Sequence, residues 1–322
     1  MLRLFQSIFG RNDAPGSYPK ALIREAIERA VDGTDPWLRG VTGYRRKLRP
    51  VVVTAIDHVI SMVEGFHAPI ELSQDSYARN PLLRACFVSS QQIQDLLNQD
   101  PALNAFRNQQ CESRPACVYA LMMMHKDERQ AFGAELMGDM LVRDVPQITV
   151  SFSHHRFIDL SADIEETKRL LKRRAYDHLL TLALNKIVVM RDERERLGRN
   201  RDLLQAKLNL FRLGRWGFDA LDKTSAPTAE ELEAEIAVIE NQLLDLDVED
   251  QSIESHRKVV QDVLGSPQDY LWTRKVRLAI DPMGIKRNQP SNQAPELWVD
   301  QIQNSAGRDV IVSLVCFRTA TA

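Results

Sequence analysis

The sequence predicts an α+β protein that is predominantly helical, with an antiparallel β-sheet and a long antiparallel coiled-coil hairpin inserted into it. Three observations predict this fold: helix start and stop signals over residues 17–107, alternating apolar strands near residue 116 and again after residue 270, and a seven-residue repeat between them. We therefore expect an N-terminal helical unit at 1–110, a sheet domain formed by 111–162 and 265–322, and the hairpin at 163–264.

Composition narrows the class of protein. The 322 residues are enough for one large or two ordinary domains, and 44% hydrophobic with 27% charged residues excludes a disordered or collagen-like chain. The net charge of −2 argues against a surface that binds nucleic acid throughout. The longest uncharged apolar run, 116–124, is far shorter than the roughly 20 residues that span a bilayer, so no transmembrane segment is expected. Four cysteines without a secretory signal predict reduced thiols and a cytoplasmic location.

The N-terminal third contains residues that are typical of helix starts and helix ends. Ser17 and Pro19 predict a helix start, and a second, longer helix is predicted to end near Gly65. Its apolar stripe has spacings of four and three residues and consists of Leu48, Val52, Ala55, Val59, Met62 and Phe66. Ser89 with Gln92 predicts a capping box, and Asp100 before a proline predicts the start of another short helix.

Strand patterns lie on both sides of the hairpin. Residues 117–124 are apolar throughout, and 147–152 alternate, which predicts a buried and a half-buried strand. Residues 132–142 fit both an alternating and a helical template, so the pattern does not decide between a strand and a helix there. Residues 272–280 alternate before a turn at Asp281-Pro282, and the nearly continuous apolar run 310–317 predicts a central strand.

Two apolar seams predict the hairpin. The first runs through Tyr176, Ala183, Met190, Leu197, Leu204 and Phe211, and the second through Leu232, Ile239, Leu246, Ile253 and Val260. Residues 163–223 hold 15 Lys/Arg against 10 Asp/Glu, whereas residues 228–262 hold 2 against 11, so a basic helix is set to pair with an acidic one. If Phe211 faces Leu232, Arg194 lies opposite residue 249 and beside Asp250. This polar seam pair, Arg194 with Asp250, is expected to fix the register.

The predicted hairpin tip is the leading candidate for a binding surface. Arg215, Trp216 and Phe218 lie among glycines where the two helices should join. Trp and Arg are typical anchor residues at protein interfaces, although the two aromatic rings could equally fold back to cap the coiled coil.

A metal site is the alternative. His154 and His155 are predicted to lie just past a strand, with Asp159 following, and imidazole with carboxylate can bind zinc or a transition metal. Adjacent strand residues point to opposite faces, so both histidines can bind one ion only if the strand has ended. Cys111 could contribute a further ligand. Common phosphate-loop and hydrolase motifs are absent from the sequence.

Two basic runs, 45–49 and 168–174, are better explained as solvated helix faces than as phosphate contacts. Residues 1–9 are amphipathic enough for a weak contact with a membrane surface, but docking on the chain itself is the simpler interpretation.

The sequence thus favours a cytoplasmic scaffold or adaptor that presents the hairpin tip to a protein partner, without a cofactor and without a catalytic signature. The alternative is a metal-dependent enzyme or metal-binding protein centred on His154 and His155. Because intramolecular and intermolecular coiled coils share the same heptads, a homo-oligomer is compatible with the sequence.

Overall fold

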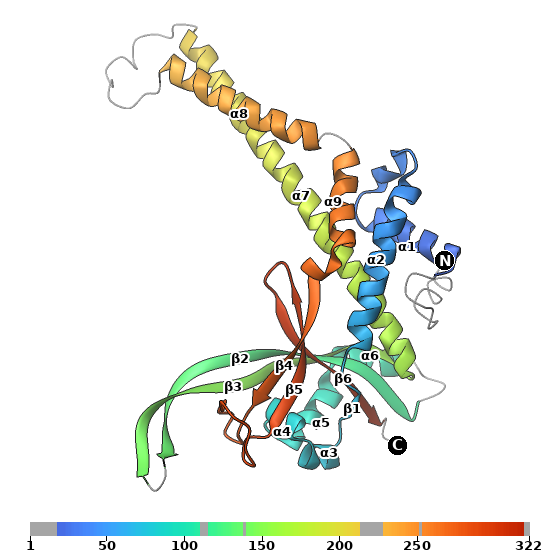
Figure 1. Ribbon diagram of the computed structural model, residues 1–322, viewed down its shortest axis with the longest axis vertical. Helices are drawn as coiled ribbons and strands as arrows, with labels where there is room; N and C mark the ends of the chain where they lie inside the picture. Colours follow the sequence, from blue (N-terminus) through green and yellow to red (C-terminus); the bar gives the residue numbers. More distant parts are fainter. Residues whose placement is uncertain (1–17, 110–114, 138–139, 213–227, 251–252, 319–322) are drawn as a thin grey trace. The chain divides into compact units, whose positions relative to one another are not determined.

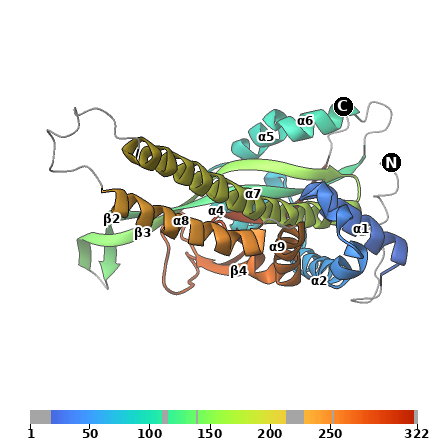
Figure 2. The same cartoon turned by 90° about the horizontal axis from the view of Figure 1, so that it is seen from above.

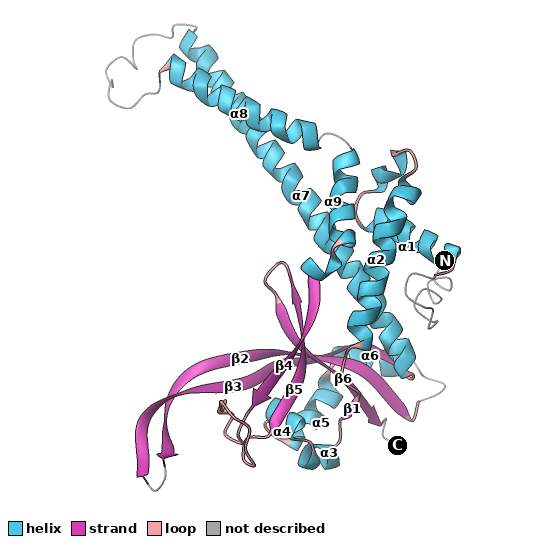
Figure 3. Ribbon diagram, viewed as in Figure 1, coloured by secondary structure: helices cyan, strands magenta, loops and turns pink. Residues whose placement is uncertain are grey.

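The computed structural model describes residues 18–109, 115–137, 140–212, 228–250 and 253–318, and within these ranges the chain is an α+β protein (Figures 1 and 3). It divides into two compact units. The first contains residues 54–176 and 266–318, and the second contains 19–53 and 177–265. The helices expected at 1–110 are therefore shared between both units. None of the described helices has the length and apolar character needed to cross a membrane.

The first unit is built on a sheet whose strand order is β3-β2-β6-β5-β4, all antiparallel along this path. The strands are β2 (Cys117–Met137), β3 (Met140–Ser161), β4 (Leu271–Ala279), β5 (Glu296–Asn304) and β6 (Asp309–Arg318). A two-residue strand, β1 (Ile70–Glu71), pairs parallel with the end of β6. The apolar run at 310–317 is confirmed as the central strand, since β6 has partners on both edges.

Strands β2 and β3 form a hairpin that is longer than the rest of the sheet. Strand β2 pairs with β6 only as far as Met124, whereas its pairing with β3 continues to Met137. The ambiguous stretch 132–142 therefore belongs to two strands wherever it is described. The connection between β4 and β5 reaches the outer edge of this hairpin, where the Val150 amide donates to Gly284 O at 2.7 Å and the Lys286 amide donates to Ile148 O at 2.8 Å.

Four short helices cover one face of the sheet (Figure 1): α3 (Gln74–Arg79), α4 (Pro81–Cys86), α5 (Ser90–Gln99) and α6 (Pro101–Gln109). The predicted cap at Ser89 is present, because its hydroxyl accepts a hydrogen bond from the Gln92 amide at 3.3 Å. Asp100 caps α6 and also accepts from the backbone of β3. Apolar side chains from these helices and from all five main strands form one core, which includes Leu83, Phe87, Ile93, Leu103, Val118, Met122, Phe152, Phe157, Leu278, Val299, Ile311 and Phe317.

Parts of two further helices, α2 (Tyr44–Glu64) and α7 (Ile164–Arg212), belong to the first unit and contact its strands. His58 on α2 lies 2.7 Å from Leu271 O through Nε2, and Thr167 on α7 donates its hydroxyl to Tyr119 O at 3.4 Å. Glu64 joins the two helices by accepting from Lys172 at 2.6 Å and from Lys168 at 2.9 Å.

The second unit is helical and contains α1 (Lys20–Gly33), the 3₁₀ helix η2 (Pro36–Gly40), α8 (Ala229–Asp250), α9 (Ile253–Gly265) and parts of α2 and α7. Asp35 ties three of these elements together. Its carboxylate lies 2.6 Å from His256 Nδ1 on α9, accepts from Arg191 on α7 at 3.0 Å, and caps η2 through the Trp37 amide. A buried carboxylate is tolerated because each of these contacts offsets its desolvation.

Helix α7 has 49 residues, and α8 lies along its C-terminal part (Figures 1 and 2). The two helices share a hydrophobic cluster to which, among the described residues, no other element contributes. It is formed by Leu197, Leu204, Leu208, Ala229, Leu232, Ile236, Ile239 and Leu243. Thr228 and Glu231 form the predicted capping box at the start of α8. The second predicted seam does not form one helix over the described residues. It is divided between α8 and α9, and Ile253 is 38% exposed.

Candidate functional site

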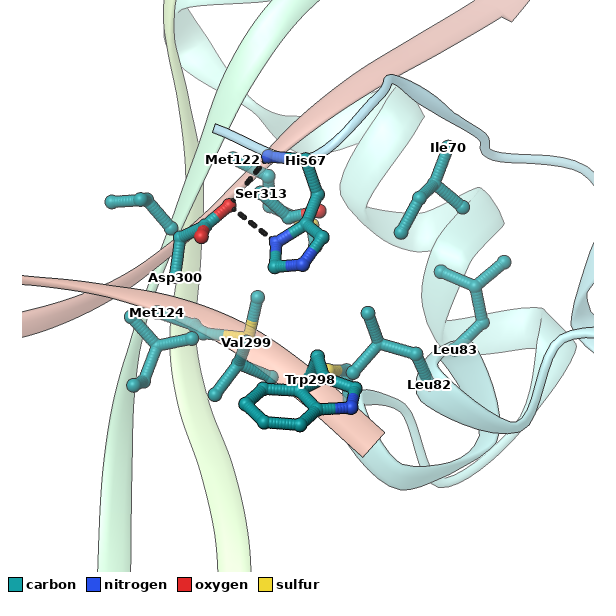
Figure 4. A pocket seen from close by; sticks show the side chains of 13 residues that line it. His67, Ile70, Leu82, Leu83, Met122, Met124, Trp298, Val299, Asp300 and Ser313 are labelled. Atoms are coloured by element: carbon teal, nitrogen blue, oxygen red, sulfur yellow. Dashed lines mark hydrogen bonds and ion pairs between the residues drawn. The ribbon is translucent and has the colours of Figure 1, made fainter. Parts of the chain in front are cut away.

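The sheet forks at one edge of its central strand. Strand β5 pairs with β6 only as far as Val312, and β1 begins to pair with the same edge at Val315. Ser313 and Leu314 thus have no strand partner on that edge among the described residues. The opening between β5 and β1 leads to a small hollow, which we name the fork pocket (Figure 4).

His67 and Asp300 occupy the fork. Asp300 lies on β5 with a side chain only 5% exposed, and its Oδ2 accepts from the His67 backbone amide at 2.8 Å and faces His67 Nδ1 at 2.9 Å. Because a carboxylate can only accept, Nδ1 carries the proton in this contact. In the neutral imidazole, Nε2 is then left with its lone pair available.

The fork pocket is small and largely apolar. Its volume is about 20 Å³, which is room for a water molecule or a single ion. It is lined by His67, Ile70, Leu82, Leu83, Cys86, Met122, Met124, Trp298, Val299, Asp300, Ile311, Val312 and Ser313. Figure 4 shows Asp300 on one side of His67 and Ile70 and Leu83 on the other, with Trp298 below the ring. Ligand pockets for organic molecules usually have several hundred Å³, so this hollow is too small for an organic substrate.

The chemistry available in the fork pocket is that of an oriented imidazole among sulfur atoms. A histidine whose Nδ1–H is held by a carboxylate is a typical metal ligand or general base. Burial raises the pKa of the Cys86 thiol to about 12, so this group stays protonated near neutral pH. Besides the Asp300 carboxylate, the side-chain donor atoms that line the pocket belong to the His67 imidazole, the thioethers of Met122 and Met124, the Cys86 thiol and the Ser313 hydroxyl.

The predicted location of the two adjacent histidines was wrong. Strand β3 continues to Ser161, so His154 and His155 lie within the strand rather than past its end. His154 is exposed, has a positive φ of 55°, and its Nδ1 lies 3.0 Å from Ser153 Oγ. His155 instead stacks on Phe87 with ring centroids 4.5 Å apart, and burial lowers its pKa.

Asp159 is not brought to these histidines as a third ligand, because its carboxylate forms a two-point ion pair with Arg174 at 2.7 Å. Within the described ranges, no group of three His, Cys, Asp or Glu side chains is placed to hold a metal ion. Cys111 lies outside those ranges. A metal centre at His154, His155 and Asp159 therefore stays a prediction, and the described side chains add no third ligand to it.

The predicted tip residues Arg215, Trp216 and Phe218 lie outside the described residues, as does the segment 1–9. Asp250 is the last residue of α8, but its side chain is also outside the description, so its pairing with Arg194 stays a prediction.

Several cations of the two basic runs already have acidic partners. Arg45 donates to Glu28 at 2.8 Å, and Lys168 and Lys172 bind Glu64. These pairs reduce the positive charge that is available to a phosphate backbone.

No local sequence pattern marks the His67–Asp300 pair, because 233 positions separate its members and neither lies in a recognisable motif. The one available signal was an acid at position 300 within an otherwise strand-like run, ELWVDQIQN.

Comparison with protein-family models found no match, and searches of curated proteins and of solved structures found no similar chain.

Proposed function

We propose that this protein is a scaffold or adaptor that presents α7 and α8 as a coiled-coil hairpin to a protein partner. The observation that carries the proposal is the hydrophobic cluster to which, among the described residues, only these two helices contribute. A pair of helices with its own core does not depend on other elements for burial of its seam, so it can extend and remain ordered.

The surface of the two helices also supports a binding role. Leu203 on α7 and Val238 and Leu244 on α8 are each more than half exposed, although their helices bury other aliphatic side chains. These exposed side chains are available for contact with a partner. The exposed Glu residues of α8 would select against acidic partners.

The predicted contact is the connection between the helices, where Arg215, Trp216 and Phe218 supply anchor-type side chains. The test is affinity purification from native lysate with three proteins: the wild type, Trp216→Ala/Phe218→Ala, and a control, Val188→Ala/Val189→Ala, which changes two exposed residues of α7 outside the hydrophobic cluster. A specific partner should be retained by the control and lost from the tip variant, with circular dichroism unchanged in both.

Metal content measured on the same samples distinguishes the adaptor proposal from the alternative, a metal-dependent function. Identical partners in all three samples would overturn the adaptor proposal. Stoichiometric metal that is lost in His154→Ala would then favour the metal-dependent alternative centred on His154 and His155.

A further inference from the structure

We propose that the fork pocket binds one copper(I) ion through the thioether sulfurs of Met122 and Met124 and through Nε2 of His67. This inference concerns the first unit and is independent of the adaptor proposal. Its basis is the set of side chains that the fork brings together.

The two methionines reach the pocket because of strand geometry. Met122 and Met124 are two residues apart on β2, so both point to the same face of the sheet, and each is only 1% exposed. Met123, between them, points to the opposite face and does not line the pocket. Two thioethers and one imidazole therefore line the same hollow, near the residues of β6 that have no strand partner on the edge facing β5 and β1.

The donor set selects the metal. Thioether sulfur is a soft ligand that prefers copper(I), whereas magnesium and calcium require several oxygen ligands. Among the described residues, Asp300 is the only carboxylate that lines the pocket, and it already accepts from the His67 amide and contacts His67 Nδ1. Structural zinc sites usually have four Cys or His ligands, whereas the lining of this pocket supplies one imidazole and one thiol.

The surroundings of His67 suit a metal ligand. Asp300 fixes the ring orientation and keeps the proton on Nδ1, as carboxylates commonly do for ligating histidines. A volume of about 20 Å³ fits an ion but no organic ligand. His67 and Trp298 have exposed fractions of 40% and 46%, which gives an ion a route from solvent.

The first experiment is an anaerobic titration of the full chain with the copper(I)–bicinchoninate complex. Other thiols would compete, so the background protein carries Cys111→Ser, Cys117→Ser and Cys316→Ser. We expect one copper(I) per chain. Met122→Leu/Met124→Leu, which nearly preserves side-chain volume, should abolish this transfer, whereas the matched control Met123→Leu should leave it unchanged.

The role of Asp300 is tested separately. Asp300→Asn should weaken copper(I) binding by about 10- to 100-fold, the usual effect of removing a group that orients a ligand. Cys86→Ala should leave the affinity unchanged. Circular dichroism establishes that each variant is folded before it is titrated.

X-ray absorption at the copper edge provides a test that needs no pocket variant. In the Cys86→Ala form of the background protein, copper–sulfur scattering can come only from methionine. We expect sulfur and nitrogen neighbours together. A first shell of nitrogen and oxygen alone, no copper taken from the chelator, or equal loss in the Met123→Leu control would overturn the proposal.

Discussion

Asp100 stabilises the first unit at the junction between a helix and the edge of the sheet. It is 4% exposed, and its Oδ1 accepts from the Leu103 amide at 2.9 Å to cap α6. Its Oδ2 accepts from the Phe157 amide at 3.0 Å. Phe157 lies on β3, the outer strand of the sheet path, so one carboxylate satisfies a helix end and a strand edge together.

Replacing Asp100 with alanine should be costly because both backbone amides stay buried. Loss of a helix cap costs about 1 kcal/mol, and a buried unsatisfied amide costs about 1–3 kcal/mol. With both amides affected, we expect Asp100→Ala to lower the local free energy of opening by about 2–5 kcal/mol. Asp100→Asn keeps one acceptor oxygen and should lose about half as much.

Hydrogen exchange followed by mass spectrometry measures this effect in the peptides that cover α6 and β3. Ser89→Ala is the matched control, because Ser89 caps α5 with a single, exposed hydrogen bond. Its cost should be about 1 kcal/mol at most and should be restricted to α5. If Asp100→Ala destabilises α6 and β3 no more than Ser89→Ala destabilises α5, the double role of Asp100 is refuted.

Three further predictions concern other contacts. Burial acts to raise the Glu64 pKa, but the hydrogen bonds from Lys172 and Lys168 outweigh burial and lower the pKa below its ordinary value of 4.5. Ionised Glu64 therefore stabilises the folded protein above the pKa that Glu64 has in the unfolded chain. This stabilisation is lost as the pH falls through the lower pKa of the folded state. Glu64→Gln should therefore flatten the acid side of the stability–pH profile in thermal melts, and an unchanged slope would contradict this. Gly284 has a φ of +80°, and an added Cβ would lie 3.2 Å from Val150 O, so Gly284→Ala should cost about 1–3 kcal/mol in urea unfolding; a neutral result would exclude this strain. Ile236→Ala should cost about 2–5 kcal/mol locally and increase exchange in α8 while α1 stays protected, and equal loosening of both helices would show that the cluster is not separate.

Helices whose signals are local were predictable from the sequence. The stripe in α2 is an example: Leu48, Val52, Ala55, Val59 and Met62 are all buried, as their spacing indicates. The capping groups are equally local, since a Ser or Asp side chain bonds amides only two or three residues away. Such features depend on neighbours along the chain, and for this reason they can be read without the fold.

Strand β5 was missed for the opposite reason. Asp300 and Gln301 are buried within it, and polar residues at buried positions obscure the alternation that marks a strand. The partner that makes this burial tolerable, His67, is 233 residues away. A site formed by two such distant residues has no characteristic sequence spacing by which it could be predicted. It exists only after the chain has folded.

The placement of His154 illustrates a third limit. The alternating run was predicted to end before His154, but the ladder with β2 continues past a register shift. A positive φ at His154 lets the strand bulge and resume. Local sequence marks such an irregularity but cannot tell whether pairing resumes beyond it.

The central position of β6 has a consequence for synthesis of the protein. Strand β2 is made almost 200 residues before its neighbour β6. Until the ribosome has released residues 309–318, the apolar segment 117–124 can pair only with β3, because the central strand of the sheet is still missing. The contacts between α7 and α8 are closer in sequence, so these two helices can pack together before the sheet is complete. Nascent chains that stop before β6 should therefore expose β2 and be prime substrates for chaperones.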